Sequence, residues 1–320
     1  MTIHYRELGR SGLQVSPLSF GGNVLGWTAD EAHSLALLDA WVAEGFNFID
    51  TADVYSRWAD GNSGGESETL LGRWLQQSGK REQVVIATKV GMSMGEGRKG
   101  LRPEYIREAV DASLQRLQTD YIDLYYAHLD DAETPLEDTL GAFDALVKAG
   151  KVRAIGASNY SAARLQEALR ISTDNGLARY EVLQPLYNLY DRAEFEQELL
   201  PVVQQHQLGV SSYYALAAGF LTGKYRKPED VGQSTRGASV VEKYLNPRGL
   251  LILDKLDIVA ERYASTPATV ALAWLMAQPG VTSPIVSASR TAQLPDLVAA
   301  ARLELDADAL EELRLASCYT

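Results

Sequence analysis

Cysteine is nearly absent from this chain of 320 residues, which holds only Cys318. An intrachain disulfide is therefore excluded, and a thiol so close to the end of the sequence is a poor candidate for a built-in nucleophile. The four histidines, at positions 4, 33, 128 and 206, form neither an HExxH motif nor a pairing with cysteine. We therefore expect no dedicated metal site.

Basic residues are also in the minority, since 30 Lys and Arg stand against 42 Asp and Glu, a formal charge of −12. Such a chain has no general positive field for nucleic acid or anionic lipid, although a local pocket can still hold a phosphate. No run of about 18 apolar residues occurs, and the start, MTIHYRELGR, lacks an apolar signal core. We expect a cytoplasmic protein that acts on a small molecule rather than on nucleic acid or a membrane.

Short apolar runs alternate with longer segments of helical spacing along nearly the whole chain, a pattern that predicts repeated βα units. The candidate strands are Leu18–Gly21, Phe46–Asp50, Val84–Lys89, Tyr121–Ala127, Val152–Gly156, Val182–Gln184, Gly209–Tyr213 and Thr282–Val286.

Amphipathic segments separate these strands, as parallel crossovers require. They are Asp30–Glu44, Ser67–Gln77, Pro103–Leu117, Leu136–Ala149 and Ala162–Leu169, and helical spacing resumes at Leu250–Tyr263 and Pro267–Ala277. Eight such units close into a barrel more naturally than they form an open sheet. We therefore predict an α/β fold, a (β/α)8 TIM barrel, as a single domain over residues 1–320.

Two segments depart from the repeat. Tyr5–Leu8 and Leu13–Val15 flank Gly-Arg-Ser-Gly, which predicts a β-hairpin that plugs the bottom of the barrel. Gly219–Asn246, after the seventh strand, is polar and too long for an ordinary connection, so it is a candidate lid or ligand clasp.

Titratable side chains follow three consecutive strands at the end where barrel active sites lie. Asp50 ends the second strand and Tyr55 follows it, Lys89 ends the third, and His128 ends the fourth. The ammonium of Lys89 would lower the pKa of the Tyr55 phenol, Asp50 would hold Lys89, and His128 would hydrogen-bond a substrate oxygen. Together they predict a general acid beside an electrophilic pocket.

Three motifs support one family. GFNFIDTADVY (Gly45–Tyr55), GASNY (Gly156–Tyr160) and GFLTGKY (Gly219–Tyr225) occur in order and resemble the signature, G-x-S-N and cofactor-loop motifs of the aldo-keto reductases. The resemblance is to the long-loop type, close to the potassium-channel beta-subunit-like branch, and covers nearly the whole chain. It implies that Asp50, Tyr55, Lys89 and His128 form the family's catalytic tetrad.

No GxGxxG follows a strand, so a Rossmann mode of dinucleotide binding has no support. The resemblance implies a nicotinamide across the barrel mouth, with its carboxamide held by Ser158, Asn159 and Gln184 and its ring stacked on Tyr213. An alternative for Asn159 is that it caps the following helix. For the phosphates, the candidates are Lys224, Arg236 and the backbone of Leu216, Ala217 and Gly219.

The segment Ser287–Leu294, SASRTAQL, resembles the family's adenosine-phosphate segment and opens a helix. Arg290 would meet a 2′-phosphate and so favour NADPH over NADH, with Ser287, Ser289, Gln293 and Asp296 around it. Two departures imply weaker or less selective cofactor binding. Tyr214 replaces a family serine, and Leu297 replaces the asparagine that would contact adenine.

The resemblance implies NADPH-dependent reduction of an aldehyde or ketone, with Tyr55 as general acid and a pocket walled by Trp27, Trp58 and His128. Two alternatives stay open. Lys89 at a barrel strand end could attack a carbonyl as a Schiff-base lyase or aldolase. The likeness to channel beta subunits also allows a nucleotide-binding regulatory subunit.

Overall fold

The computed structural model describes residues 3–319, so the domain expected over 1–320 includes three residues outside that range. Eight parallel strands form one sheet in the order β10-β3-β4-β5-β6-β7-β8-β9. They are β3 (Ser19–Gly21), β4 (Phe48–Asp50), β5 (Val85–Val90), β6 (Ile122–Ala127), β7 (Val152–Ser158), β8 (Tyr180–Gln184), β9 (Gly209–Val210) and β10 (Ile285–Val286). Every predicted strand is present and in the predicted order.

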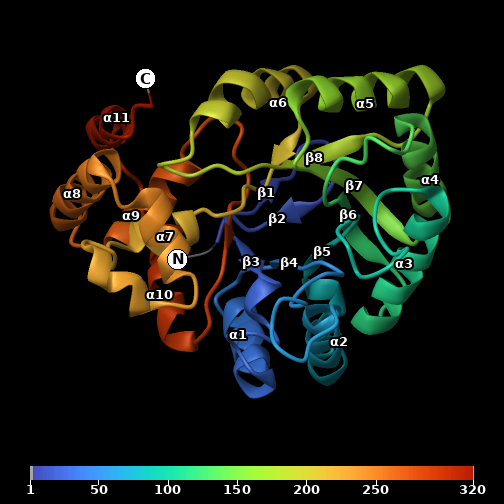
Figure 1. The fold of residues 1–320 in the computed structure, drawn as a ribbon, viewed down its shortest axis with the longest axis horizontal. Coiled ribbons are helices and arrows are strands. Elements are labelled where there is room, and N and C mark those ends of the chain that lie inside the picture. The colour runs from blue at the N-terminus through green and yellow to red at the C-terminus, as the bar shows by residue number, and fades with distance from the viewer. Residues whose placement is uncertain (1–2, 320) are drawn as a thin grey trace.

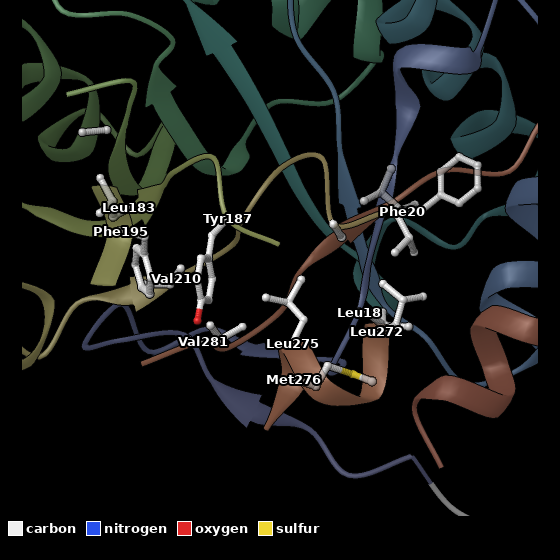
Figure 2. Close-up of a cluster of buried hydrophobic side chains, with 14 of the residues drawn as sticks. Leu18, Phe20, Leu183, Tyr187, Phe195, Val210, Leu272, Leu275, Met276 and Val281 are labelled. Atoms are coloured by element: carbon white, nitrogen blue, oxygen red, sulfur yellow. The ribbon is translucent and has the colours of Figure 1, made fainter. Parts of the chain in front are cut away.

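Backbone hydrogen bonds join the two ends of this sheet. Thr282 N donates to Val210 O at 2.9 Å, and Ile285 N donates to Ser212 O at 2.8 Å. The side chains of α9 (Pro267–Met276) cover this seam, and Figure 2 shows Leu272 and Leu275 packed in one apolar cluster with Leu18 and Val210. The sheet therefore closes on itself, as the predicted (β/α)8 barrel requires.

Helices follow the strands and surround the barrel (Figure 1). They are α1 (Glu31–Ala43), α2 (Glu66–Ser78), α3 (Pro103–Leu117), α4 (Leu136–Lys148), α5 (Ala162–Asn175), α6 (Leu200–His206) and α10 (Leu294–Ala300). Their ends have local causes: Asp30 and Ser161 cap α1 and α5 by accepting hydrogen bonds from backbone amides. Pro103 occupies the first position of α3, where its missing N–H costs nothing.

The N-terminal hairpin pairs β1 (Arg6–Glu7) with β2 (Gln14–Val15). Its apolar residues Leu8, Leu13 and Val15 join a cluster with inward-facing strand residues such as Phe48 and Leu124. The predicted hairpin is therefore confirmed, and it packs its apolar face into the barrel interior.

The long segment after β9 is ordered. It contains the 3₁₀ turns Ala217–Thr222 and Pro228–Gln233, followed by α7 (Gly237–Tyr244) and α8 (Pro247–Arg262). The chain then ends in α11 (Ala307–Ala316), which lies against α8 in Figure 1.

Several predicted bounds were wrong. The predicted strands Gly209–Tyr213 and Thr282–Val286 shrink to the two-residue strands β9 and β10, because the seam there is made by single backbone hydrogen bonds. The helix predicted to end at Leu169 runs on to Asn175 and ends where Gly176 adopts φ 63°. Helix α7, inside the segment Gly219–Asn246 that we expected to be a lid or ligand clasp, was not predicted.

Candidate active site

The four predicted catalytic side chains lie at the carboxyl ends of three adjacent strands. Asp50 is the last residue of β4, Lys89 lies near the end of β5, and His128 directly follows β6. Tyr55 lies in the loop that follows β4. Its backbone carbonyl accepts hydrogen bonds from Gly65 N and Ser67 N, near the end of the same loop. In the parallel register, Asp50 lies beside Ala87 of β5, and Lys89 lies beside Tyr126 of β6, so the carboxyl ends of these strands meet at one end of the barrel.

Lys89 is the centre of this group and is fully buried. Its Nζ donates to Asp50 Oδ1 at 2.5 Å, to Thr51 O at 2.7 Å and to the Tyr55 hydroxyl at 3.1 Å. The three donors of the ammonium are therefore all used, and one of them faces the phenol.

A buried ammonium in this setting stays charged. Burial opposes the charge on Lys89, but the nearby Asp50 and Tyr55 outweigh it and raise the pKa of Lys89. Gln184 completes the arrangement by donating from Nε2 to Asp50 Oδ2 at 2.8 Å. Asp50 therefore accepts a hydrogen bond on each oxygen, and the ion pair is held from both sides.

The expected lowering of the Tyr55 pKa is wrong in its net direction. Burial raises the pKa of Tyr55, and the attraction of Lys89 offsets that rise only in part. A phenol in this environment keeps its proton at neutral pH and has a charged donor beside its oxygen. It can therefore supply a proton, while Lys89 stabilises the negative charge that remains.

His128 is 5% exposed, and its ring lies 5.9 Å from that of Tyr55. Burial, together with the Lys89 charge, lowers the pKa of His128 well below its usual value, so the imidazole is neutral. Its Nδ1 is buried without a hydrogen-bond partner among residues 3–319. Nε2 is not buried in this way, so it is the ring nitrogen that a bound molecule can reach.

The residues expected at the nicotinamide form a connected group beside this centre. Ser158 Oγ donates to Gln184 O at 3.0 Å, and Asn159 Nδ2 donates to Ser158 Oγ and to His128 O, each at 3.0 Å. The Tyr213 hydroxyl donates to Asn159 Oδ1 at 2.8 Å. The structure thus brings all four residues together at the barrel mouth, with amides and a phenol suited to a carboxamide and a planar ring.

Arg236, which lies in the long segment after β9, contacts the loop that follows β3. With the Asn23 amide oriented so that both of its ends are satisfied, Arg236 Nη2 donates to Asn23 Oδ1 at 2.9 Å and Asn23 Nδ2 donates to Ser287 Oγ at 2.7 Å. The sequence interpretation missed Asn23, which follows the glycine pair after β3. That glycine pair was the available signal for a close backbone approach.

The other expected phosphate residues are more scattered. The amides of Ala217 and Gly219 donate within their own turn, to Tyr214 O and Leu216 O, so they are already engaged. Lys224 is exposed, and its ammonium lies 5.2 Å from the Tyr225 ring.

After β10, Gln293 Oε1 accepts hydrogen bonds from the amides of Ser289 and Arg290, at 2.8 and 3.3 Å. Arg290 itself is exposed. Asp296 is in the first turn of α10, which directly follows, and its backbone carbonyl accepts a hydrogen bond from Thr269 Oγ1.

Aromatic rings border Tyr55. Trp58 packs edge-on against Tyr55 at 5.5 Å between ring centroids, and Trp27 packs edge-on against Trp58 at 5.6 Å. The guanidinium of Arg236 lies 5.0 Å from the Trp27 ring and 5.8 Å from the Tyr214 ring. Trp58 is 46% exposed and Tyr214 is 45% exposed, so both rings are open to solvent.

Comparison with known proteins identifies the family of this chain. The aldo/keto reductase family model matches residues 17–317. The chain belongs to the aldo/keto reductase family. It is accordingly an NAD(P)H-dependent oxidoreductase, and the resemblance inferred from its motifs is confirmed.

Curated relatives cover nearly the full length of this aldo/keto reductase. The uncharacterized oxidoreductase YrpG of Bacillus subtilis is 34% identical, over 97% of this chain and 95% of the relative. A probable voltage-gated potassium channel subunit beta of Arabidopsis thaliana is 35% identical, over 92% and 90%. The aldo-keto reductase yakc [NADP(+)] of Schizosaccharomyces pombe is 32% identical, over 98% and 91%.

Within 3–319, none of the helices combines the length and apolar character needed to cross a bilayer. The same residues contain no group of three His, Cys, Asp or Glu side chains arranged to hold a metal ion.

Proposed function

We propose that this protein reduces an aldehyde or ketone to an alcohol with NADPH, and that Tyr55 is the proton donor. The observation that carries the proposal is the position of Lys89 Nζ, which donates to both Asp50 and the Tyr55 hydroxyl. A buried ammonium held against a phenol is suited to stabilise the phenolate that forms when the proton leaves.

A reduced nicotinamide, when bound at the barrel mouth, would supply the hydride that the carbonyl carbon receives. The hydroxyl of Tyr55 gives its proton to the carbonyl oxygen, and the electron pair of that O–H bond stays on the phenolate beside Lys89. His128, neutral and with Nε2 as its available nitrogen, donates a hydrogen bond to the same oxygen as its negative charge develops. Asp50 and Gln184 hold Lys89 in the orientation that the step requires.

The nicotinamide would be held by Ser158, Asn159, Gln184 and Tyr213, which lie together at the barrel mouth. Arg236 and Arg290 are the cations for its phosphates, and Arg290 is the residue that favours NADPH. The relative from S. pombe that is named with NADP(+) supports this preference.

The test is a titration of the purified protein with NADPH and NADH by fluorescence quenching, followed by 340 nm turnover on aldehydes and ketones. Wild type is compared with Tyr55→Phe, which removes only the hydroxyl. We expect NADPH to bind both proteins and turnover to fall about 10²- to 10⁴-fold in the variant. Undiminished turnover in Tyr55→Phe would exclude the phenol as proton donor.

A Schiff-base lyase is a weaker proposal for this site. An imine requires a neutral amine, whereas Lys89 is paired with Asp50 and has a raised pKa. Borohydride trapping of substrate on Lys89, without consumption of NADPH, would favour it.

A nucleotide-binding regulatory subunit is the other alternative, supported by the relatives named as potassium channel beta subunits. Tight NADPH binding without turnover of any carbonyl in the panel would favour that role.

A further inference from the structure

Asp53 lies in the same loop as Tyr55 but faces the other way, outside the barrel. It is 1% exposed, and neither of its carboxyl oxygens has a hydrogen-bond partner among residues 3–319. Its backbone amide donates to Lys89 O at 3.3 Å, so the residue is fixed at the strand end. A buried carboxyl in this condition has no role in the proton donation described above.

Several charged or titratable groups face Asp53 from the elements around it. Glu68 of α2 is fully buried and accepts hydrogen bonds from Thr88 Oγ1 at 2.5 Å and from Arg116 Nε at 2.7 Å. Arg116 belongs to α3. Lys89, on β5, forms an ion pair with Asp50. The remaining titratable groups nearby are Tyr105 of α3, Arg98 of the preceding loop, and Tyr125 of β6, whose hydroxyl also lacks a partner.

This arrangement favours a protonated Asp53. The Arg116 guanidinium is the cation near both buried carboxyl groups, those of Asp53 and Glu68, and it already donates a hydrogen bond to Glu68. Burial and the neighbouring Glu68 raise the pKa of Asp53 to about 8, while Arg116 opposes the rise. Asp53 is therefore neutral at pH 7 and becomes charged under mildly alkaline conditions.

The loop connects Arg116 to the catalytic tyrosine. A Cβ added to Gly65 would lie 2.5 Å from Arg116 Cδ, so the glycine turn rests directly on the arginine. The same turn holds Tyr55, because Gly65 N donates to Tyr55 O at 3.1 Å and Ser67 N donates to it at 3.2 Å. A shift of Arg116 therefore moves the backbone that positions the phenol.

We propose that Asp53 is a positioning residue for Tyr55: its neutral carboxyl fits beside Glu68, whereas the charged form draws Arg116 away and displaces the Tyr55 loop. The role rests on the proposed reduction, since it concerns the alignment of the proton donor. Asp53 itself touches neither the substrate nor the cofactor.

The sign of the pH effect follows from the raised pKa. The folded protein binds this proton more tightly than the unfolded chain, in which an aspartate titrates near pH 4, about its ordinary value. The stabilisation is fully present below that value and is lost as the pH rises to about 8. Activity should fall above about pH 8 for the same reason.

The experiment compares single-turnover rates at saturating NADPH from about pH 6 to pH 10 for wild type, Asp53→Asn and Asp60→Asn. Asp60 is an exposed aspartate of the same loop and serves as the matched control. We expect the rates of wild type and Asp60→Asn to fall about tenfold per pH unit above about pH 8, and that of Asp53→Asn to stay level there. An identical alkaline decline in Asp53→Asn would overturn the proposal, as would a uniform loss of rate at every pH.

A second variant, Glu68→Gln, should shift the alkaline decline in rate in the direction opposite to Asp53→Asn. It frees Arg116 to stabilise an ionised Asp53, so the alkaline decline should begin at a lower pH than in wild type. An unchanged decline in this variant would also count against the proposal.

Unfolding by urea at about pH 6.5 and pH 9 needs no substrate and separates the two proposals. Wild type should lose stability between these pH values, and Asp53→Asn should lose less. If no carbonyl is turned over but this difference is present, the proposed reduction has failed while the titration of Asp53 stands. If carbonyls are turned over, but wild type and Asp53→Asn lose the same stability between the two pH values, the proposal for Asp53 has failed and the proposed reduction stands.

Discussion

Gln184 donates a hydrogen bond to Asp50 Oδ2 at 2.8 Å, across a barrel in which 134 residues of sequence separate the two. Lys89 Nζ donates a hydrogen bond to the other oxygen of the same carboxylate, Asp50 Oδ1. Gln184 therefore contacts a residue of the proposed catalytic group, in addition to the role expected for it beside the nicotinamide. This contact connects the proposed cofactor site to the proposed proton donor.

Replacement of Gln184 by leucine should affect both stability and chemistry. The variant leaves one oxygen of a buried carboxylate without a partner, which costs about 1–3 kcal/mol of unfolding free energy. We expect the turnover number to fall as well, because Lys89 loses its fixed orientation. Urea unfolding and 340 nm assays measure the two effects, with Gln76→Leu as a surface control, since Gln76 is exposed and bonds only the Gln118 carbonyl. Equal behaviour of the two variants would show that the contact is dispensable.

Lys89→Met should destabilise the protein by about 3–5 kcal/mol, because it leaves the Asp50 charge buried with only Gln184 beside it. The double variant Asp50→Asn/Lys89→Met should recover much of that loss. Lys151→Met is the matched control, since its pair with Asp111 is solvent-exposed and should contribute about 1 kcal/mol or less. A double variant no more stable than Lys89→Met would mean that packing, rather than charge, sets the cost.

Arg290→Ala should weaken NADPH binding and leave NADH binding unchanged. Charge-assisted hydrogen bonds to a phosphate contribute about 1.5–3 kcal/mol, which corresponds to about a 10- to 100-fold change in Kd. Fluorescence titration with both nucleotides measures this, and Arg302→Ala, an exposed arginine paired with Glu44, is the control. A parallel loss for both nucleotides would assign Arg290 to a phosphate that they share.

His128 should make the folded protein sensitive to acid. Its pKa is lowered in the folded state, so below the unfolded value near 6.5 the unfolded chain binds the proton and the folded chain does not. Stability contributed by the neutral ring is therefore present above about pH 6.5 and declines by up to about 1.4 kcal/mol per pH unit below it.

Unfolding by urea between about pH 7 and pH 5 tests this titration. His128→Asn should lose less stability than wild type, whereas the exposed control His4→Asn should behave like wild type. If His128→Asn loses as much stability as wild type, acid sensitivity has another source.

The barrel could be predicted from the local pattern of apolar and polar residues in the sequence. Apolar runs of strand length, separated by amphipathic helices, specify parallel crossovers wherever they occur, and eight of them leave few alternatives to closure. The end of α5 was also present in the sequence as Asn175-Gly176, a helix stop that the periodicity alone did not reveal. The two-residue strands β9 and β10 were overestimated because their extent depends on the partner segment across the seam.

By itself, the sequence determined the order of the strands, the N-terminal hairpin, the family, and the placement of Asp50, Tyr55, Lys89 and His128 at one end of the barrel. These features depend on residue type and spacing, which are local. Only the tertiary structure decided the contact of Asn23 with Arg236, the raised pKa of Tyr55, and the burial of the Asp53 carboxyl without a hydrogen-bond partner among residues 3–319. Those properties arise from burial and from groups distant in sequence, because desolvation and charge act through space rather than along the chain.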